Sequence, residues 1–357
     1  MWRRVVVLWL ASRVVLVALG LLFTSQLAWH RKIETWQSQP WQALTGWDTV
    51  YYITISHTGY APGQTLAFFP LYPLLIRGFR ELSSSGDAVA SLGVAALALL
   101  AAMAGLAVLA RDRLSLDHAN RSLLYLILSP FGFVLALAYT EALFLALAAW
   151  LFVCSDRRRY GPAIALGLAA GLTRVTALAL VAPLLVVAWR RRSIAAATVA
   201  VTPALGVAAF MAYLHDKVND ALAFVHAQSG WGGHATFPLF APVEELIDFA
   251  HDHHPVRLLG VAALIAYLLL LIPILRRPIF AAHRVEDTLF VAGVFFLPLV
   301  SGVMQSTGRF GLVAFPLWFA LADVGLRKLA VHRTYVVFAP VVQIVLFAYV
   351  ALGYLVP

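Results

Sequence analysis

Long apolar runs separated by short basic turns make up most of the chain. One run covers about residues 5–29 behind Arg3 and Arg4, and another covers about residues 88–110 and ends at Arg111. A helix needs about 20 apolar residues to cross a bilayer, and basic turns favour the cytoplasmic side. The pattern therefore predicts an all-α polytopic membrane protein whose N-terminus is cytoplasmic.

Two central apolar runs, 122–155 and 161–189, allow two interpretations. Polar residues interrupt each run once, at Glu141 and at Arg174. A single helix per run would place the arginines at 157–159 outside, against the positive-inside rule. Hairpins of short helices, each about 14 residues and about 21 Å long, keep every basic turn inside and put Glu141 and Arg174 at outer turns. We favour the hairpins, and the single-helix alternative stays open.

With hairpins, the chain has about eleven crossings, within a range of about nine to eleven, and its C-terminus lies outside. The first outer loop is then 30–87 and the second is 215–255. The first loop is rich in Trp and Tyr, and its apolar piece 67–76 is too short to span and contains two prolines. These features predict interfacial helices in that loop. No repeat or linker is visible, so we expect a single membrane-embedded domain over residues 1–357.

The composition agrees with this class of protein. Hydrophobic residues make up 62% of the chain, charged residues make up 12%, and the mean hydropathy is +0.85. A soluble domain is about half apolar and a quarter charged. The net charge of +9 comes from turns between apolar runs and not from a continuous basic face, so we expect no nucleic-acid partner.

Metal and disulfide chemistry have little support in the sequence. The chain has one cysteine, Cys154, which excludes an intramolecular disulfide and a cysteine-based metal site. The stretch 251–254 in the second outer loop reads His-Asp-His-His and resembles a set of metal ligands. Adjacent histidines on a loop more often form a solvated polar turn. We therefore predict no metal and no cofactor; a divalent cation is not indicated, although the sequence leaves it open.

Four charged residues fall on the outer side, each at the end of an apolar run: Asp48, Glu141, Arg174 and Arg309. Ionisable groups at a membrane edge are candidate functional sites. Each also has a structural alternative: a helix cap for Asp48, a favourable helix dipole for Glu141, snorkelling or pairing with Glu141 for Arg174, and an ordinary loop position for Arg309. Arginine binds phosphate and a carboxylate accepts a proton from a hydroxyl, so together the four suit a lipid-phosphate sugar donor.

Several sequence blocks resemble the PIG-V family, the mannosyltransferase of GPI-anchor assembly with its bacterial relatives. The resemblance extends over about residues 1–325 and places the blocks in the family's order. The blocks are Trp47-Asp48-Thr49-Val50-Tyr51-Tyr52 with Gly59-Tyr60, Phe68-Phe69-Pro70-Leu71-Tyr72-Pro73-Leu74-Leu75, Ser129-Pro130 through Tyr139-Thr140-Glu141-Ala142-Leu143-Phe144, Gly171-Leu172-Thr173-Arg174-Val175-Thr176, and Gly308-Arg309-Phe310 with Phe315-Pro316. The His-rich second outer loop matches no block of the family.

The resemblance implies a GT-C glycosyltransferase, a polytopic enzyme that uses a polyprenyl-phosphate sugar on the outer face. The family's catalytic acid lies in the first outer loop, which by position is Asp48. The implied reaction is inverting transfer of a mannosyl residue from a polyprenyl-phosphate donor to a lipid-linked or cell-envelope glycan. The residues expected to bind substrate or donor are Trp47, Tyr51, Tyr52, His57, Glu141, Arg174 and Arg309.

In this hypothesis Arg174 and Arg309 bind the leaving phosphate, and Glu141 positions a sugar hydroxyl or orients Arg174. The aromatic residues Trp47, Tyr51 and Tyr52 form an apolar wall and stack on the sugar. A composition rich in Ala, Val and Arg suggests a high-GC bacterium, and hence a multi-pass protein of the plasma (inner) membrane with an extracytoplasmic active site. Membrane lipid, the donor and a glycan acceptor are the expected partners. A transporter or flippase of a lipid-linked sugar is the alternative, although transporters usually contain inverted repeats and none is visible here.

Overall fold

The computed structural model describes residues 1–26, 41–228, 236–253, 255–300, 304 and 306–355. Within these ranges the chain is helical and has no strand, and five helices are long and apolar enough to cross a membrane. The five are α1 (Trp2–Gln26), α5 (Asp87–Arg113), α10 (Ile194–Val218), α13 (Pro255–Arg276) and α17 (Leu329–Ala351). The all-α polytopic fold predicted from the sequence is confirmed.

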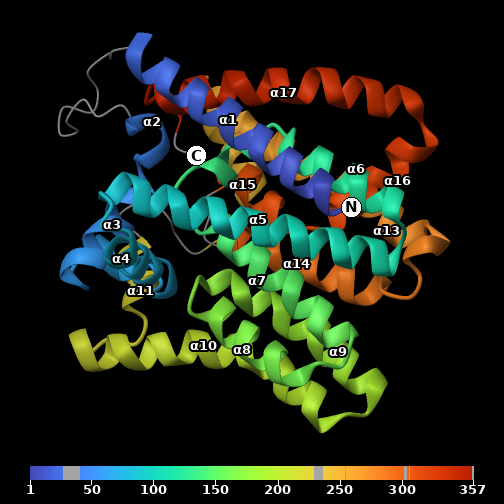
Figure 1. Ribbon diagram of the computed structural model, residues 1–357, viewed down its shortest axis with the longest axis horizontal. Helices are drawn as coiled ribbons and strands as arrows, with labels where there is room; N and C mark the ends of the chain where they lie inside the picture. The colour runs from blue at the N-terminus through green and yellow to red at the C-terminus, as the bar shows by residue number, and fades with distance from the viewer. Residues whose placement is uncertain (27–40, 229–235, 254, 301–303, 305, 356–357) are drawn as a thin grey trace.

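A sixth candidate span is a bent pair. Helices α15 (Thr307–Val313) and α16 (Pro316–Arg327) meet at 81° and together are long enough to cross. Shorter helices complete the bundle (Figure 1). They include α14 (Arg284–Val300) and the four helices of the two central runs. The count of about eleven crossings therefore stays a prediction.

Both central runs are broken, as the hairpin interpretation requires. The first run divides into α6 (Leu116–Ile127) and α7 (Glu141–Asp156), with the short 3₁₀ helix η2 (Gly132–Ala136) in the break. The second divides into α8 (Tyr160–Gly171), η3 (Val175–Leu180) and α9 (Val181–Arg191). Helix α6 begins beside the end of α5, and α7 returns to that end because Asp156 pairs with Arg113 at 2.8 Å. The single-helix alternative is wrong.

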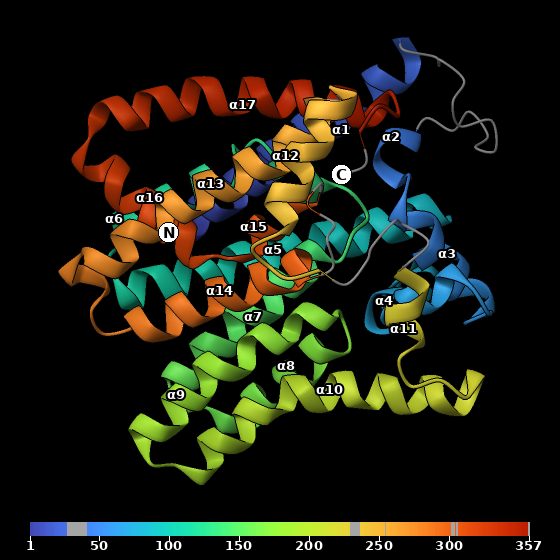
Figure 2. The ribbon, with the colours of Figure 1, turned by 180° about the vertical axis from the view of Figure 1, so that it is seen from behind.

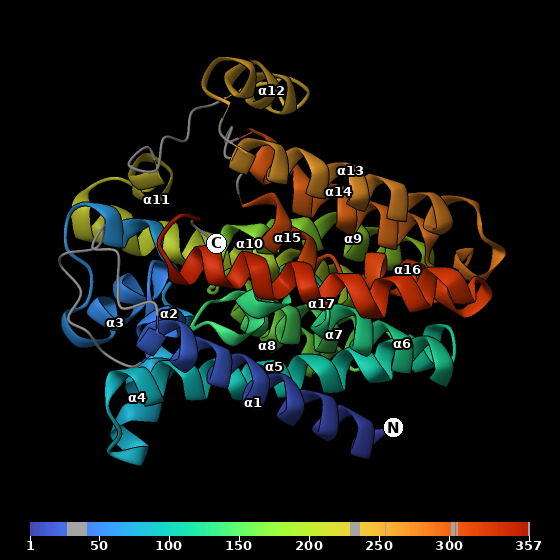
Figure 3. The same cartoon turned by 90° about the horizontal axis from the view of Figure 1, so that it is seen from above.

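The packing follows the order of the chain. Helices α8, α9 and α10 pack together on one side of the molecule, α1 and α17 lie on the opposite side, and α5 and α7 run between them (Figures 1 and 3). Close approach of α8 to α10 depends on glycine. A Cβ on Gly171 would lie 2.2 Å from the carbonyl oxygen of Pro203 and 2.8 Å from Gly206 Cα. Small residues allow this approach between membrane helices.

Basic turns gather at one end of the bundle, which we call the basic end. Ser115 and Ser193 start α6 and α10 there as N-caps, accepting bonds from backbone N–H groups. Arg113 pairs with Asp156 at 2.8 Å and with Asp287 at 2.9 Å, and thereby ties α5 to α7 and α14. Arg113 from one of the predicted basic turns thus forms ion pairs that join separate helices.

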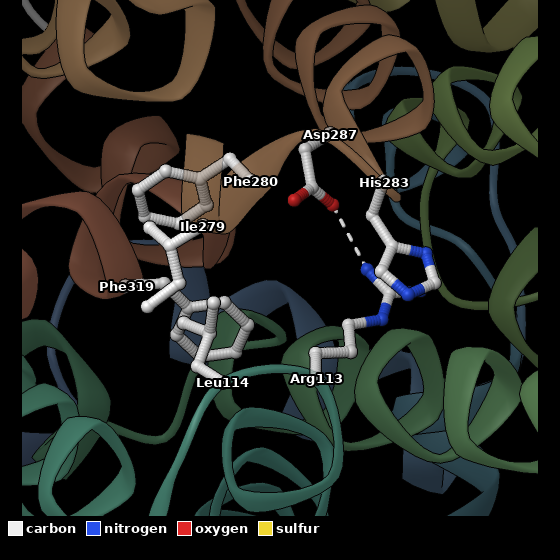
Figure 4. A pocket seen from close by; sticks show the side chains of 7 residues that line it. All are labelled: Arg113, Leu114, Ile279, Phe280, His283, Asp287 and Phe319. Carbon is white, nitrogen blue, oxygen red and sulfur yellow. Dashed lines mark hydrogen bonds and ion pairs between the residues drawn. The ribbon is translucent and has the colours of Figure 1, made fainter. Parts of the chain in front are cut away.

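A small cavity of about 10 Å³ lies at the basic end, enough for about one water molecule. Figure 4 shows Arg113 and Asp287 facing each other there, with His283 beside them and apolar side chains opposite. His283 lies in the turn before α14, where burial and then the positive charge of Arg113 lower its pKa to about 4. His283 is therefore neutral at physiological pH. The apolar lining consists of Leu114, Ile279, Phe280 and Phe319.

The opposite end carries the two loops predicted to be outside. The first loop forms α2 (Gln42–Thr45), α3 (Asp48–Thr58), η1 (Gln64–Ala67) and α4 (Leu71–Ser83), and the second forms α11 (Ala223–His226) and α12 (Ala241–Asp252). None of these helices is a candidate span, and α4 lies across the direction of α5 (Figures 1 and 3). This arrangement agrees with the interfacial helices that the sequence predicts.

The two loops contact each other through an apolar cluster. Leu66 and Phe69 of the first loop pack against Phe210 and Leu214 of α10 and Phe224 of α11. Figure 2 shows α11 beside α3 and α4, and Figure 3 shows α12 above α13, at the edge of the molecule. Trp36 of the first loop and His234 and His254 of the second lie outside the described residues.

Candidate functional site

The four charged residues singled out in the sequence meet at the end opposite the basic end. Arg309 Nη1 lies 2.8 Å from Asp48 Oδ2, and Arg174 Nη1 lies 2.9 Å from Glu141 Oε1. Arg309 Nε also faces the same Glu141 oxygen at 3.7 Å. We call these four residues the charge cluster. Its members come from α3, α7, the turn before η3, and α15, so only the tertiary fold brings them together.

Both carboxylates of the charge cluster sit at helix starts. Asp48 is the first residue of α3 and follows Trp47, whose φ is positive at 56°. Glu141 is the first residue of α7 and follows the break in the first central run. A negative charge at a helix N-terminus is favoured by the helix dipole. The dipole alternative considered for Glu141 therefore describes its local setting and does not conflict with a chemical role. The cap alternative for Asp48 is wrong, because Trp47 is the N-cap of α3 and no side-chain cap bond forms there.

The arginine of the second central run lies in the break between α8 and η3. Arg174 has an extended backbone at φ −170° and ψ 153°, which ends the helical path and turns the side chain toward Glu141. Its Nε donates to Thr176 Oγ1 at 3.2 Å. The tight contact of Gly171 with α10 fixes the end of α8 three residues earlier. Packing of glycines thus sets where Arg174 enters the charge cluster.

The last arginine is placed by two glycines of α15. A Cβ on Gly308 would lie 2.2 Å from the ring of Phe131, and a Cβ on Gly311 would lie 2.0 Å from the ring of Tyr267. The hydroxyl of Tyr267 donates to the carbonyl oxygen of Gly308 at 2.9 Å. Helix α15 is thus held between two aromatic rings, and this contact fixes the position of Arg309.

Aromatic rings cover both guanidinium groups. The guanidinium carbon of Arg309 lies 5.7 Å from the ring centre of Tyr139 and 5.8 Å from that of Phe310. That of Arg174 lies 5.1 Å from Phe310. Such contacts strengthen when water is excluded. The sequence analysis quoted Tyr139 and Phe310 only as motif residues. Phe310 directly follows Arg309 and Tyr139 lies two residues before Glu141, and this closeness to charged residues was the signal that could have identified them.

Accessibility divides the charge cluster into two layers. The side chains of Asp48 and Arg309 are each 18% exposed, whereas Glu141 is 3% exposed and Arg174 is 12% exposed. Arg174 Nη1 and Arg309 Nε are buried and have no aligned hydrogen-bond acceptor among the described residues, although both face Glu141. Two carboxylates balance two guanidinium groups. The outer layer therefore offers an ion pair that an anionic ligand could open.

The aromatic residues next to Asp48 take different positions. Tyr52 is 6% exposed, packs edge-on against Phe68 and Tyr72, and approaches Thr140 Oγ1 with its hydroxyl at 3.4 Å. Tyr51 stacks on Phe68 at 4.8 Å and hydrogen-bonds Gln64. Burial of Tyr52 leaves it without a surface for stacking on a sugar, so the geometry does not support that predicted role. Trp47 and Tyr51 are only half-buried.

The expectation that His57 shares the site with Asp48 has no support in the geometry. His57 lies at the other end of α3, about 13 Å away along the axis at 1.5 Å per residue. Its Nε2 is 2.8 Å from Asp87 Oδ1 and 2.8 Å from Arg80 Nη1. Closeness in sequence misled here, because nine residues of helix separate the two side chains. His57 belongs to a contact between α3, α4 and α5.

No cluster of three or more His, Cys, Asp or Glu side chains able to hold a metal occurs in the described part of the chain. In the second outer loop, His226 Nδ1 lies 2.7 Å from Asp220 Oδ2. Arg257 lies 2.7 to 3.2 Å from the carboxylates of Asp252, Asp248 and Glu245. These acids therefore act in ion pairs.

Comparison with known proteins finds a family match over part of the chain and a similar fold. Residues 14–158 match the mannosyltransferase (PIG-V) family. This match covers the blocks around Asp48 and Glu141 and confirms the resemblance predicted from them. The blocks around Arg174 and Arg309 lie beyond it. No curated protein matches the chain.

Among solved structures, the crystal structure of ArnT from Cupriavidus metallidurans bound to undecaprenyl phosphate is similar with a TM-score of 0.51 and 15% identity, over 95% of this chain and 71% of that chain. The oligosaccharyltransferase of Archaeoglobus fulgidus, in complex with Zn and sulfate, gives 0.44 and 11% identity over 95% and 52% of the two chains. The likeness to ArnT shows a GT-C-like fold. Family and fold together support a glycosyltransferase.

Proposed function

We propose that this chain, whose residues 14–158 match the mannosyltransferase (PIG-V) family, is an inverting glycosyltransferase. It moves a mannosyl residue from a polyprenyl-phosphate donor to a lipid-linked or cell-envelope glycan on the extracytoplasmic face of the plasma membrane. The observation that carries the proposal is the accessible ion pair of Asp48 and Arg309 at 2.8 Å, backed by buried Glu141 and Arg174. This arrangement offers one carboxylate for a hydroxyl and two arginines for a phosphate.

The arginines suit the donor's phosphate. Guanidinium groups bind phosphate oxygens through paired N–H donors and keep their charge at any physiological pH. Arg174 and Arg309 point at a common carboxylate, Glu141, so they lie close enough to contact the same anion. ArnT, whose fold is similar, was crystallised with undecaprenyl phosphate. That ligand supports a polyprenyl phosphate as the lipid part of the donor.

The reaction then needs one base. Asp48 accepts the proton of the acceptor hydroxyl while that oxygen attacks the anomeric carbon from the face opposite the phosphate. The bond between the anomeric carbon and the phosphate oxygen breaks, and polyprenyl phosphate leaves with both electrons of that bond. Arg174 and Arg309 stabilise the charge that develops on it. A phosphate leaves without protonation, so the second carboxyl group that glycosidases use as an acid is not required.

The ion pair between Asp48 and Arg309 orders these events. Before the donor binds, Arg309 holds the carboxylate that must later accept a proton. A phosphate that engages Arg309 weakens this pair and leaves Asp48 to the acceptor hydroxyl. Glu141 remains behind both arginines and keeps their side chains aligned. Donor binding therefore prepares the base.

The location follows from the charge pattern. The charge cluster lies at the end opposite the basic turns, and basic turns favour the cytoplasm. The site then faces the extracytoplasmic side, near the level of the outer headgroups, where a lipid-linked donor presents its phosphate. The aromatic residues Trp47 and Tyr51 lie beside Asp48 at this level, where such rings are favoured.

The test uses the full chain reconstituted in lipid vesicles with radiolabelled polyprenyl-phosphate mannose and membrane glycolipids. Label should pass to a lipid or glycan product with the unchanged chain and not with Asp48→Asn. Asp87→Asn is the matched control, because Asp87 is an outer carboxylate paired with Arg80 but outside the charge cluster. Movement of the intact donor across the bilayer without a new glycosidic bond would overturn the proposal in favour of a transporter.

A further inference from the structure

The break between α6 and α7 is buried along most of its length. We call residues 128–140 the broken segment; side chains 131–140 are all buried. The helical hydrogen-bond ladder stops here. Short-range bonds replace part of it, such as Gly132 N–H to Ser129 O at 2.8 Å, and Ala138 N–H donates to Leu44 O of α2 at 3.3 Å. In a membrane protein every such backbone group needs a partner inside the bundle. The remaining carbonyl groups must be satisfied from other helices.

One of these partners is Gln343 of α17. Its amide Nε2 donates to the carbonyl oxygens of Ile127 at 3.0 Å and Ser129 at 2.9 Å. The side chain is 6% exposed and lies in the apolar second half of α17. Gly132 leaves the space for it, since a Cβ there would lie 2.4 Å from Gln343 Nε2. Gln343 therefore caps the end of α6 and the start of the broken segment.

The second partner is Arg13, near the middle of α1. Its Nη2 donates to the carbonyl oxygen of Leu135 at 2.6 Å. Arg13 forms no ion pair with any carboxylate in the described part of the chain. An unpaired cation in the interior of a spanning helix is costly and marks a functional position by default. The hydrogen bond to the carbonyl oxygen of Leu135 gives Arg13 a structural role in holding the broken segment.

The far end of the broken segment touches the charge cluster. Thr49 Oγ1 donates to Ala138 O at 3.2 Å, and the Asp48 amide approaches the Tyr139 hydroxyl at 3.4 Å. The ring of Tyr139 lies beneath Arg309, and Glu141 begins α7 two residues later. A shift of the broken segment would therefore move the ring, the buried carboxylate and the start of α3 together.

We infer that Arg13 and Gln343 are positioning residues, which hold the broken segment from α1 and α17 and so set Tyr139 and Glu141 within the charge cluster. Neither side chain contacts the charge cluster, and both act through backbone carbonyl groups. Loss of either leaves buried carbonyls without donors, and the segment moves to find others. The consequence for turnover rests on the proposed function, whereas the displacement of Tyr139 does not.

The experiment places one 3-fluorotyrosine at position 139 of the full chain in lipid nanodiscs and records its fluorine NMR resonance. Arg13→Leu and Gln343→Leu should shift or split the resonance, because the ring leaves its place under Arg309. Arg13→Lys keeps a charged donor and should restore most of the native signal. Val199→Ala is the control. Val199 is a buried residue of α10, so the substitution opens a cavity without touching the broken segment and should leave the resonance unchanged.

Kinetics supply the second readout. Arg13→Leu should lower kcat about 10- to 100-fold, the cost of a misplacement of about 1 Å, with the KM for donor little changed. Val199→Ala should keep kcat. An unchanged resonance with native kcat in both leucine variants overturns the inference, and so does an equal shift in Val199→Ala. If Arg13→Leu does not fold, the same resonance and kcat are measured in Arg13→Gln and Gln343→Leu, and these two variants test the inference. A wild-type chain without transferase activity refutes the proposed function only. The resonance of Tyr139 still tests whether Arg13 and Gln343 hold the broken segment in place.

Discussion

Asp48→Asn should separate catalysis from donor binding. The substitution keeps the shape of the side chain and removes the charge that accepts a proton. General-base catalysis contributes about 10²- to 10⁴-fold, so turnover should fall at least about a hundredfold. The structure adds a second effect with the opposite sign. Asp48 Oδ2 lies 2.8 Å from Arg309 Nη1 and competes with the donor's phosphate for that guanidinium group.

The size of this second effect follows from the geometry of the pair. Both side chains are 18% exposed and the contact uses one Nη1 atom, so about 1 kcal/mol is a reasonable value for a partly solvated pair. Its removal should tighten donor binding about fivefold, since 1.4 kcal/mol is tenfold. The assay is equilibrium binding of radiolabelled donor to the purified chain, beside a single-turnover transfer measurement. Asp87→Asn controls for the loss of an outer carboxylate.

Two results would refute the reasoning. Near-native turnover in Asp48→Asn would mean that another group is the base, and Glu141 would be the first to examine. Weaker donor binding would mean that Asp48 does not compete with phosphate, so the ordering of events through the ion pair would be wrong. Loss of protein accumulation alone, with native turnover per folded molecule, would make the carboxylate structural.

Three further predictions concern other parts of the molecule. Arg174→Ala should weaken donor binding at least about tenfold in the equilibrium assay, because a charge-assisted bond to phosphate is worth about 1.5–3 kcal/mol, and unchanged binding would remove Arg174 from the phosphate site. Gly308→Ala should lower kcat with little loss of accumulation, since the new methyl group meets the Phe131 ring and moves Arg309; Gly161→Ala, where the added Cβ meets nothing within 4 Å, is the control. Stability, measured by thermal unfolding, should fall as pH drops from about 6.5 to 4, because unfolded His283 binds a proton that the folded group, with its pKa lowered to about 4, does not. His283→Asn should flatten that fall.

Much of the architecture could be predicted from the order of apolar and polar residues. The length of each apolar run and the basic turns between them are local properties, and they determine helices and their direction across a membrane. The breaks at Glu141 and Arg174 were visible for the same reason, because a polar residue inside an apolar run marks a place where the helix stops or reaches water. That is how all four members of the charge cluster could be assigned to one end of the bundle.

The sequence could not show how those residues face one another. Position along a helix determines depth in the membrane, but rotation about the helix axis depends on which helices pack together. Asp48 and Arg309 are 261 residues apart, and their contact depends on Gly308 and Gly311 fitting between two aromatic rings. The same ambiguity explains why His57 seemed to share the site, although the helix carries it to the opposite end.

What the sequence determined by itself is the all-α membrane class, the common end of the bundle at which the four charges lie and the family block around Asp48, since these depend on composition and local order. Only the tertiary structure decided that Tyr52 is buried, that Tyr139 and Phe310 cover the arginines, and that Arg13 and Gln343 hold the broken segment. Arg13 and Gln343 each look like a lone polar residue in an apolar helix. Their partners are backbone carbonyl groups in a distant break between two helices. Every residue has a backbone carbonyl group, so the sequence does not show which of these groups a side chain will bind.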